Sequence, residues 1–202
     1  MDHSLPTNQA CLRNQQPILE VLSQYFTKES GVLELACGTG QHAVHMATHL
    51  PHLTWYATDT SDKLEGANLW IEYANLSNLG LSQALDVDHL PWGIVSTESI
   101  SYGFCANLIH YISPNTAQNV FKGMKDVLSS GGLFAIYGPI NEGGFTSEGN
   151  KNLDSWLKED INPLAGIKEL EDICAWGKEQ GFTLTAKEPM PANNYILFFQ
   201  KD

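Results

Sequence analysis

Basic residues are scarce in this sequence. Its 202 residues include 11 Lys and Arg against 23 Asp and Glu, which gives a formal net charge of −12 at pH 7. A nucleic-acid interface needs clustered Lys and Arg to neutralise phosphates, and anionic membrane surfaces attract basic segments for the same reason. The composition therefore argues against nucleic acid and membranes as partners and favours a small-molecule ligand.

The sequence also lacks a long apolar run and a cysteine framework. No segment approaches the ~18 apolar residues of a membrane-spanning helix, and the first residues are polar, without the apolar core of a signal peptide. The four cysteines are widely separated and form no Cys-x-x-Cys pair, so neither a disulfide scaffold nor a zinc ribbon is indicated. We expect a cytoplasmic protein in a reducing compartment.

Hydrophobic periodicity predicts alternating helices and strands. Helical spacing is typical of residues 17–28, 41–50, 61–77 and 117–128. Short apolar or β-branched runs predict strands at residues 31–37, 53–59, 81–87, 99–106 and 133–137. We expect Pro17 in the first turn of its helix, and Ser61 and Ser113 as N-caps. This alternation is typical of a parallel sheet with helices on both faces.

The last third of the chain departs from this alternation. Residues 140–152 indicate a long loop, a candidate lid, and two helical patches follow. Two further strands, at residues 182–188 and 195–200, are separated by so short a turn that they should pair antiparallel. We therefore predict one α/β domain over residues 1–202. It is a doubly wound, Rossmann-like three-layer sandwich whose seven-stranded, mostly parallel sheet has a C-terminal antiparallel hairpin.

A glycine turn after the first predicted strand carries the chemical information. In the run Glu34-Leu-Ala-Cys-Gly38-Thr-Gly40-Gln-His-Ala43, two glycines allow a sharp turn and a close approach of the backbone to a ligand. Amides at the start of the following helix can donate to a polar ligand group. Asp59, at the end of the second predicted strand, can accept both hydroxyls of an adenosine ribose. The spacing predicts nucleoside binding, and Gly38-x-Gly40-x-x-Ala43 keeps a NAD-dependent oxidoreductase open as an alternative.

Three details favour S-adenosylmethionine over NAD. Glu34 precedes the first glycine by four residues, a pattern that resembles motif I of class I methyltransferases. Asp86-Val87, at the end of the third predicted strand, resembles the adenine contact of that fold, and the closing antiparallel hairpin is similar to its final strands. The resemblance implies S-adenosyl-L-methionine as the cofactor. It implies these binding residues: Glu34, Ala36, Gly38, Thr39, Gly40, His42, Asp59, Thr60, Asp86, Val87 and Asn107.

Segments spread over nearly the whole chain resemble one branch of these enzymes, the family that includes methyltransferase-like protein 26. The matching segments are Arg13-Asn14, Pro17-Ile18-Leu19, Leu33–Ala43, Leu50-Pro51, Leu53-Thr-Trp55, Gly138-Pro139, Phe145-Thr146-Ser147 and Met190-Pro-Ala-Asn-Asn194. The resemblance implies a complete class I methyltransferase domain and names no acceptor. The family commonly has an Asn-x-x-Phe-Asp stretch and an Arg-Asp pair after the loop. This chain has Asn152-Leu-Asp154 and Glu159-Asp160 there, so substrate contacts of that loop are not transferred.

Residues on the acceptor side of class I methyltransferases follow the fourth strand, where this chain reads Cys105-Ala-Asn107-Leu-Ile-His110-Tyr111. Imidazole has a pKa suited to a general base, so we predict His110 as a catalytic residue, with Tyr137 as a second candidate. The alternative is that His110 only packs at a strand end. No Asn-Pro-Pro-Tyr segment follows this strand, which disfavours methylation of amino groups in DNA or glutamine.

The predicted function is S-adenosylmethionine-dependent methyl transfer to an unidentified small molecule. A NAD-dependent oxidoreductase and a non-catalytic S-adenosylmethionine-binding interaction module are the alternatives. His42, His45 and His49 share a helical face, but Cys or carboxylate ligands do not stand nearby in the sequence, so we expect no metal site. The sequence leaves the oligomeric state open.

Overall fold

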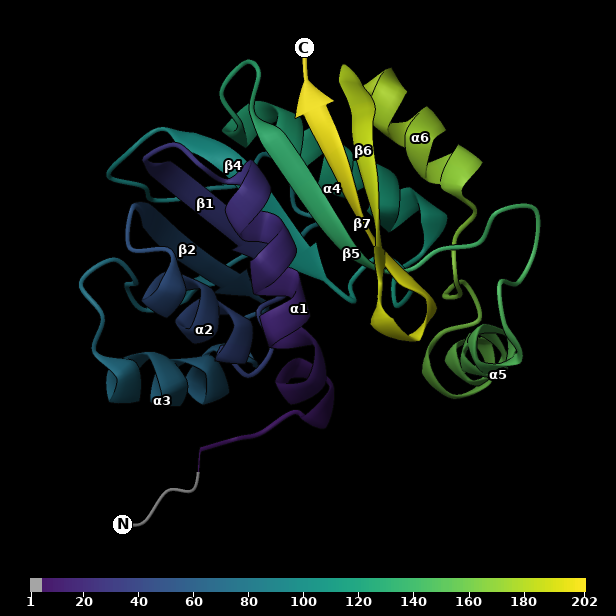
Figure 1. Ribbon diagram of the computed structural model, residues 1–202, viewed down its shortest axis with the longest axis horizontal. Helices are drawn as coiled ribbons and strands as arrows, with labels where there is room; N and C mark the ends of the chain where they lie inside the picture. The colour runs from purple at the N-terminus through teal and green to yellow at the C-terminus, as the bar shows by residue number, and fades with distance from the viewer. Residues whose placement is uncertain (1–4) are drawn as a thin grey trace.

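Seven strands form one sheet in the computed structural model, which describes residues 5–202 (Figure 1). The strands are β1 (Ser30–Leu35), β2 (Leu53–Asp59), β3 (Gln83–Ala84), β4 (Ile100–Ala106), β5 (Leu133–Pro139), β6 (Phe182–Met190) and β7 (Asn194–Lys201). Their order across the sheet is β3-β2-β1-β4-β5-β7-β6. The first five run parallel, while β7 runs antiparallel to both β5 and β6. The predicted mostly parallel sheet with a C-terminal antiparallel hairpin is confirmed.

Helices cover both faces of this sheet (Figure 1). One layer contains α1 (Gln9–Tyr25), α2 (Gln41–His49) and α3 (Leu64–Ala74), and the other contains α4 (Pro114–Val127) and α6 (Leu170–Glu179). Strand residues alternate between the layers, so that Phe104 packs toward the first and Cys105 toward the second. Helix α5 (Glu148–Trp156) and a π-helical turn (Leu157–Ile161) follow β5. Within residues 5–202, no helix has both the length and the apolar character needed to cross a membrane.

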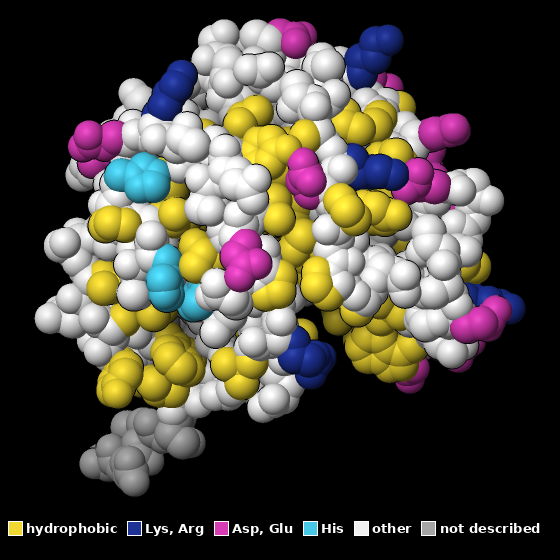
Figure 2. Space-filling view, in the orientation of Figure 1, with side chains coloured by type: hydrophobic (Ala, Val, Ile, Leu, Met, Phe, Trp, Pro, Cys, Tyr) yellow, Lys and Arg dark blue, Asp and Glu magenta, His cyan; other side chains and the backbone are white. Residues whose placement is uncertain are grey.

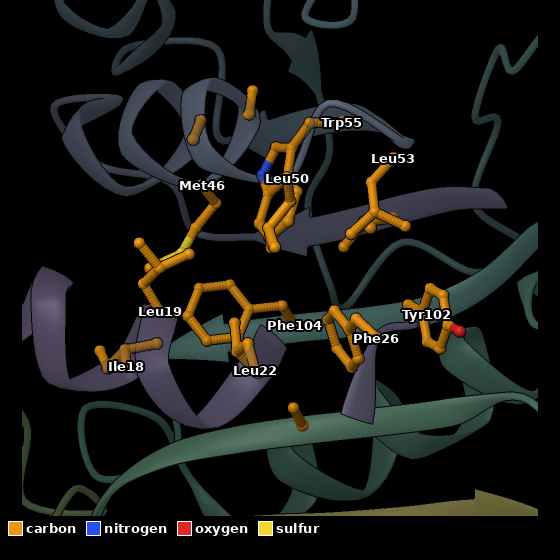
Figure 3. Close-up of a cluster of buried hydrophobic side chains, with 14 of the residues drawn as sticks. Ile18, Leu19, Leu22, Phe26, Met46, Leu50, Leu53, Trp55, Tyr102 and Phe104 are labelled. Atoms are coloured by element: carbon orange, nitrogen blue, oxygen red, sulfur yellow. The ribbon is translucent and has the colours of Figure 1, made fainter. Parts of the chain in front are cut away.

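The apolar core between the sheet and the first helical layer fixes α1 (Figure 3). Ile18 and Leu22 of α1 are fully buried, together with Met46 of α2 and Phe104 of β4. Trp55 of β2 packs edge-on against Phe104, with 6.0 Å between the ring centroids. These contacts hold the second half of α1 on the sheet, and the first half extends toward the carboxyl ends of the strands.

The start of α1 differs from the prediction. The helix begins at Gln9 rather than near Pro17, because the Asn8 side chain accepts a hydrogen bond from Ala10 N at 2.8 Å and caps the helix. Pro17 therefore lies inside the helix, where its missing N–H leaves the Arg13 carbonyl without an intrahelical donor. The additional helical turns form a wall of the candidate site described below.

Two further local predictions were wrong. Ser61 does not cap α3, because residues 60–63 form a turn closed by a hydrogen bond from Lys63 N to the Thr60 carbonyl, and the helix begins after it. The strand predicted at residues 81–87 is reduced to the two residues of β3. Ser82 N donates at 2.9 Å to a side-chain oxygen of Asn68 instead of joining the sheet.

The loop after β5 is shorter than predicted. The Ser147 hydroxyl accepts a hydrogen bond from Asn150 N at 3.0 Å and begins α5, so the second part of the predicted 140–152 loop is helical. The predicted cap of α4 is confirmed, since the Ser113 hydroxyl accepts from Thr116 N at 3.0 Å. Helix α5 thus places its own side chains beside the ends of the strands.

Alanine substitutions in the turn between β1 and α2 should lower the free energy of unfolding by different amounts. Gly40 has φ of +78°, and a Cβ there would lie 2.9 Å from the Ala67 carbonyl oxygen; Gly38 has φ of +57° but open space around it. We expect Gly40→Ala to lower the free energy of unfolding by about 2–4 kcal/mol, through backbone strain and the close contact, and Gly38→Ala by about 1 kcal/mol through strain alone. Chemical denaturation measures both.

Gly80→Ala is the matched control, because a Cβ at Gly80 meets no atom within 4 Å and its φ is not left-handed. We expect it to change the free energy of unfolding by less than about 0.5 kcal/mol. Equal effects of the three substitutions would contradict the packing of α2 against α3 described here.

Candidate functional site

A crevice crosses the carboxyl ends of the parallel strands, where β1 lies between β2 and β4 and the chain order reverses. Open α/β sheets bind their ligands at this point. The crevice has two adjoining cavities. The first, of about 630 Å³, lies between α1, the β1–α2 turn, the ends of β4 and β5, and α5. The second, of about 330 Å³, lies between the ends of β2 and β3 and the start of α4, and Ala36 and Tyr111 line both.

The structure brings most of the predicted site residues into this crevice. The first cavity is lined by Ala36, Gly38, Thr39, His42, Asn107, His110 and Tyr137, and the second by Ala36, Asp59, Thr60, Asp86 and Val87. Glu34 and Gly40 line neither cavity.

The β1–α2 turn is held in a strained conformation by its neighbour strand. Ala36, Gly38 and Gly40 all have positive φ, which for Ala36 is a backbone conformation that side chains rarely adopt. Gly38 N donates at 2.7 Å to Oδ2 of Asp59, and Thr60 N donates at 2.7 Å to Oδ1 of the same carboxylate. Asp59 therefore joins the end of β2 to the glycine turn at the junction of the two cavities.

Glu34 is buried in β1, beside β2. Its side chain is 1 % exposed, and its carboxyl group accepts a hydrogen bond from Trp55 Nε1 at 2.6 Å. Burial raises the pKa of Glu34 to about 8, so the protonated form predominates at neutral pH. Position 40 requires a glycine because α3 lies too close for a Cβ, and not because a ligand approaches it. Both residues shape the crevice without lining it.

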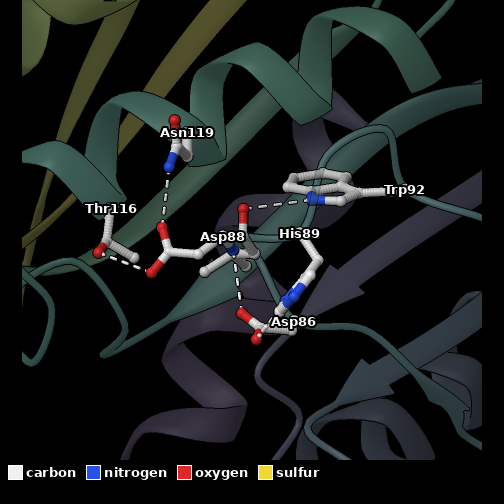
Figure 4. A network of polar contacts seen from close by, with 7 residues as sticks. Asp86, Asp88, His89, Trp92, Thr116 and Asn119 are labelled. Carbon is white, nitrogen blue, oxygen red and sulfur yellow. Dashed lines mark hydrogen bonds and ion pairs between the residues drawn. The ribbon is translucent and has the colours of Figure 1, made fainter.

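The segment after β3 forms the far wall of the second cavity (Figure 4). Asp86 is exposed, and its pKa is lowered, first by the backbone N–H of Asp88 and then by the ring of His89, 2.8 Å away. Asp88 points the other way and accepts hydrogen bonds from Thr116 and Asn119 of α4. Asp88 therefore anchors the segment, while Asp86 keeps an exposed carboxylate at the cavity.

His110 lies in the first cavity beyond the end of β4. The residue is 5 % exposed, and burial, assisted by the nearby charge of Lys168, lowers the pKa of its ring to about 4. Lys168 is itself held by the carbonyls of Ile112 and Gly166, at 2.9 and 2.8 Å. The His110 ring is therefore neutral at physiological pH, but it is a weaker base than a free imidazole, so the pKa suited to a general base that the sequence predicts is not retained in the fold.

The first half of α1 supplies a wall of the first cavity that the sequence did not predict. Cys11, Arg13 and Asn14 line it. His42 Nε2 lies 2.8 Å from the side-chain oxygen of Asn14, and its Nδ1 lies 3.8 Å from Cys11 Sγ. Because the Asn14 oxygen only accepts, Nε2 carries the ring proton and Nδ1 faces the thiol.

This trio is uncharged. Burial lowers the pKa of His42 to about 4 and raises that of Cys11 to about 11.

His45 and His49 lie together on α2, with 4.5 Å between their ring centroids, whereas His42 points to α1. Among residues 5–202, no group of three or more His, Cys, Asp and Glu side chains is placed to hold a metal ion.

The fold is similar to the Rossmann-like fold of solved methyltransferases. An S-adenosylmethionine-dependent methyltransferase, SibL, aligns over 95% of this chain and 55% of its own, with 20% identity and a TM-score of 0.77. An O-methyltransferase family protein from Burkholderia thailandensis aligns over 96% and 57%, with 16% identity and a TM-score of 0.80. An O-methyltransferase family 2 protein from Planctomyces limnophilus, in complex with apigenin, aligns over 93% and 62%, with 14% identity and a TM-score of 0.74. The chain thus spans little more than half the length of these proteins.

A family model also matches nearly the whole chain. Residues 5–201 match the family described as Protein of unknown function (DUF938), and the chain belongs to that family. The resemblance to methyltransferase-like protein 26 stays a prediction.

The two buried histidines each contribute a stabilisation that is lost in mild acid. Because the folded chain lowers the pKa of His42 and His110 from 6.5 to about 4, the unfolded chain binds protons between these values that the folded chain does not. The contribution of each ring to the free energy of unfolding is therefore fully present above pH 6.5 and is lost as the pH approaches 4, by on the order of 3 kcal/mol for each ring. Glu34, whose pKa is raised to about 8, contributes with the opposite sign over this range, so the contribution of one ring is obtained from the difference between the wild type and a histidine variant. Guanidinium denaturation of both proteins at pH 7 and pH 5 measures this difference.

His110→Gln should lose less stability than the wild type between pH 7 and pH 5. His49→Gln controls for the replacement of an exposed histidine. If His110→Gln lost as much free energy of unfolding between pH 7 and pH 5 as the wild type does, the buried ring would not be neutral in the folded chain.

Proposed function

We propose that this chain is a class I methyltransferase that transfers the methyl group of S-adenosylmethionine to a small molecule. The observation that carries the proposal is the junction of Gly38 with Asp59, where an exposed backbone turn and a carboxylate meet between two cavities. The fold shared with S-adenosylmethionine-dependent methyltransferases supports it. A single domain over residues 1–202 and a cytoplasmic location remain predictions.

The second cavity has the groups that a nucleoside requires. Asp59 and Thr60 stand where ribose hydroxyls would bind, and Asp86 and Val87 stand beyond them, where the adenine would lie. A Cβ at Gly38 would meet no atom within 4 Å, so a ligand can approach the backbone of the turn directly. These residues fit S-adenosylmethionine, with its nucleoside in the second cavity.

The methionine part would then enter the first cavity. Ala36, Gly38 and Thr39 of the turn, with His42 and Asn107, form the surface on which it would lie. Asn107 is held there by its N–H, which donates to the Tyr137 carbonyl at 2.9 Å, in a left-handed conformation with φ of +58°. Strain at Ala36 and at Asn107, on both sides of the same cavity, is typical of a ligand site.

When bound, the cofactor supplies an activated methyl group. The chain's own task is then to align the acceptor, to exclude water and, for an acceptor that arrives protonated, to accept its proton. His110 lines the first cavity and its neutral ring has an unprotonated nitrogen for this last role, with a proton affinity that burial lowers. Tyr137, 5 % exposed at the end of β5, is the second candidate and would orient the acceptor through its hydroxyl.

Two alternatives remain. The pattern Gly38-x-Gly40-x-x-Ala43 is compatible with NAD, and a chain that binds S-adenosylmethionine without transferring its methyl group would have the same nucleoside cavity. The antiparallel β6–β7 pair at the sheet edge favours a methyltransferase over a nicotinamide enzyme.

Ligand-dependent thermal denaturation tests the proposal. S-adenosylhomocysteine at 100 times its Kd should stabilise the chain by about 2.7 kcal/mol, and NAD at the same concentration should not. Asp59→Asn should weaken S-adenosylhomocysteine binding by about 10–100-fold, since it removes a charged acceptor of hydrogen bonds. Glu179→Gln, at an exposed position of α6 outside both cavities, is the matched control and should bind as the wild type does.

Stabilisation by NAD without stabilisation by S-adenosylhomocysteine would overturn the proposal in favour of the oxidoreductase. Release of S-adenosylhomocysteine from S-adenosylmethionine across a metabolite panel separates an enzyme from a binding module. Turnover that falls in His110→Gln, with cofactor affinity retained, supports the base role. Cofactor binding without turnover on any compound would favour the module.

A further inference from the structure

The two cavities differ sharply in charge. The second is lined by three carboxylates, Asp59, Asp86 and Asp88. The first, though larger, is lined by no Asp or Glu among the described residues, in a chain that has 23 of them. Its two histidines are neutral, because burial lowers both pKa values to about 4. Of the side chains that line this wall within residues 5–202, only that of Arg13 is charged.

Arg13 is also the only arginine in the sequence. Its side chain is exposed on α1, and no carboxylate of residues 5–202 lies within 4.0 Å of it, whereas Lys63, Lys158 and Lys187 each form such a pair. A guanidinium presents a planar fork of donors that matches a carboxylate. Figure 2 shows a hollow on this face of the molecule with a basic side chain at its rim. The wall thus offers an unused site for an anion.

The position of Arg13 along the crevice separates it from the nucleoside end. Its charge acts on Tyr137, whose pKa is raised by burial and lowered by Asn14 and Arg13. Tyr137 lies on β5, and the sheet order places β5 on the opposite side of β1 from β2 and its Asp59. Arg13 therefore lies on the wall of the first cavity, away from the ribose site.

We propose that the methyl acceptor of this chain carries a carboxylate, and that Arg13 binds it. The inference rests on the proposed methyltransferase function and adds the class of substrate. With a formal net charge of −12, the molecule as a whole repels anions. An anionic acceptor therefore needs a local cation, and a cavity wall free of carboxylates provides the surroundings in which one arginine is effective.

The cofactor has a carboxylate of its own, and the test must distinguish the two sources. Phenylglyoxal modifies arginine, and because the chain has one arginine, the intact mass reports modification of Arg13 alone. Three additions are compared: 5′-methylthioadenosine, which lacks the carboxylate; S-adenosylhomocysteine, which has it; and S-adenosylhomocysteine together with matched pairs of small hydroxy and amino acids and their primary amides.

We expect Arg13 to react at similar rates with either nucleoside bound. At least one acid should slow the modification of the S-adenosylhomocysteine-loaded chain by about tenfold or more, while its amide does not. That acid should bind about tenfold more weakly to Arg13→Gln, with affinity partly restored in Arg13→Lys. Lys122→Gln, which removes one exposed charge from α4, should bind it as the wild type does.

If S-adenosylhomocysteine without any acid slowed the modification of Arg13 and 5′-methylthioadenosine did not, Arg13 would bind the carboxylate of the cofactor, and the inference would be overturned. A panel in which no acid protects better than its amide would overturn it as well. Both results are compatible with stabilisation of the wild type by S-adenosylhomocysteine, so they are distinct from a failure of the proposed function, in which that stabilisation is absent.

Discussion

The hydrogen bond from Gly38 N to Oδ2 of Asp59 joins the two strands on which the crevice depends. It fixes the β1–α2 turn, with left-handed residues at Ala36, Gly38 and Gly40, against the end of β2. Farther back in the sheet, Glu34 of β1 accepts a hydrogen bond from Trp55 of β2. Because Asp59 holds the turn, the backbone of Gly38 stays open toward the first cavity and the Asp59 carboxylate stays at the edge of the second.

Burial then determines which groups near this turn are charged. Glu34, His42 and His110 are each at most 5 % exposed, and burial shifts each pKa toward the neutral form. The carboxylates of the second cavity remain in or near solvent. The crevice is consequently acidic at one end and neutral at the other, apart from Arg13. This division of charge connects the proposed cofactor orientation with the proposed acceptor.

Much of this arrangement was predictable from local sequence. The glycine turn, Asp59 and Asp86 follow strand ends that hydrophobic patterns mark clearly, and parallel strands bring their carboxyl ends together. The wall formed by α1 was not predicted, because Pro17 is typical of a first helical turn and the cap is Asn8, nine residues before Pro17. The orientation of His42 toward Asn14, and the burial of His110, depend on long-range packing that spacing alone does not encode.

The proposed function requires S-adenosylmethionine to bind across the ends of β1, β2 and β4. The most direct measurement is amide NMR of the full chain, labelled with ¹⁵N and titrated with S-adenosylhomocysteine. We expect the largest shifts at Gly38, Thr60 and Asn107, and no shift at Lys187 on β6. Unchanged resonances at Gly38 and Thr60, with saturable shifts elsewhere or none at all, would contradict this expectation.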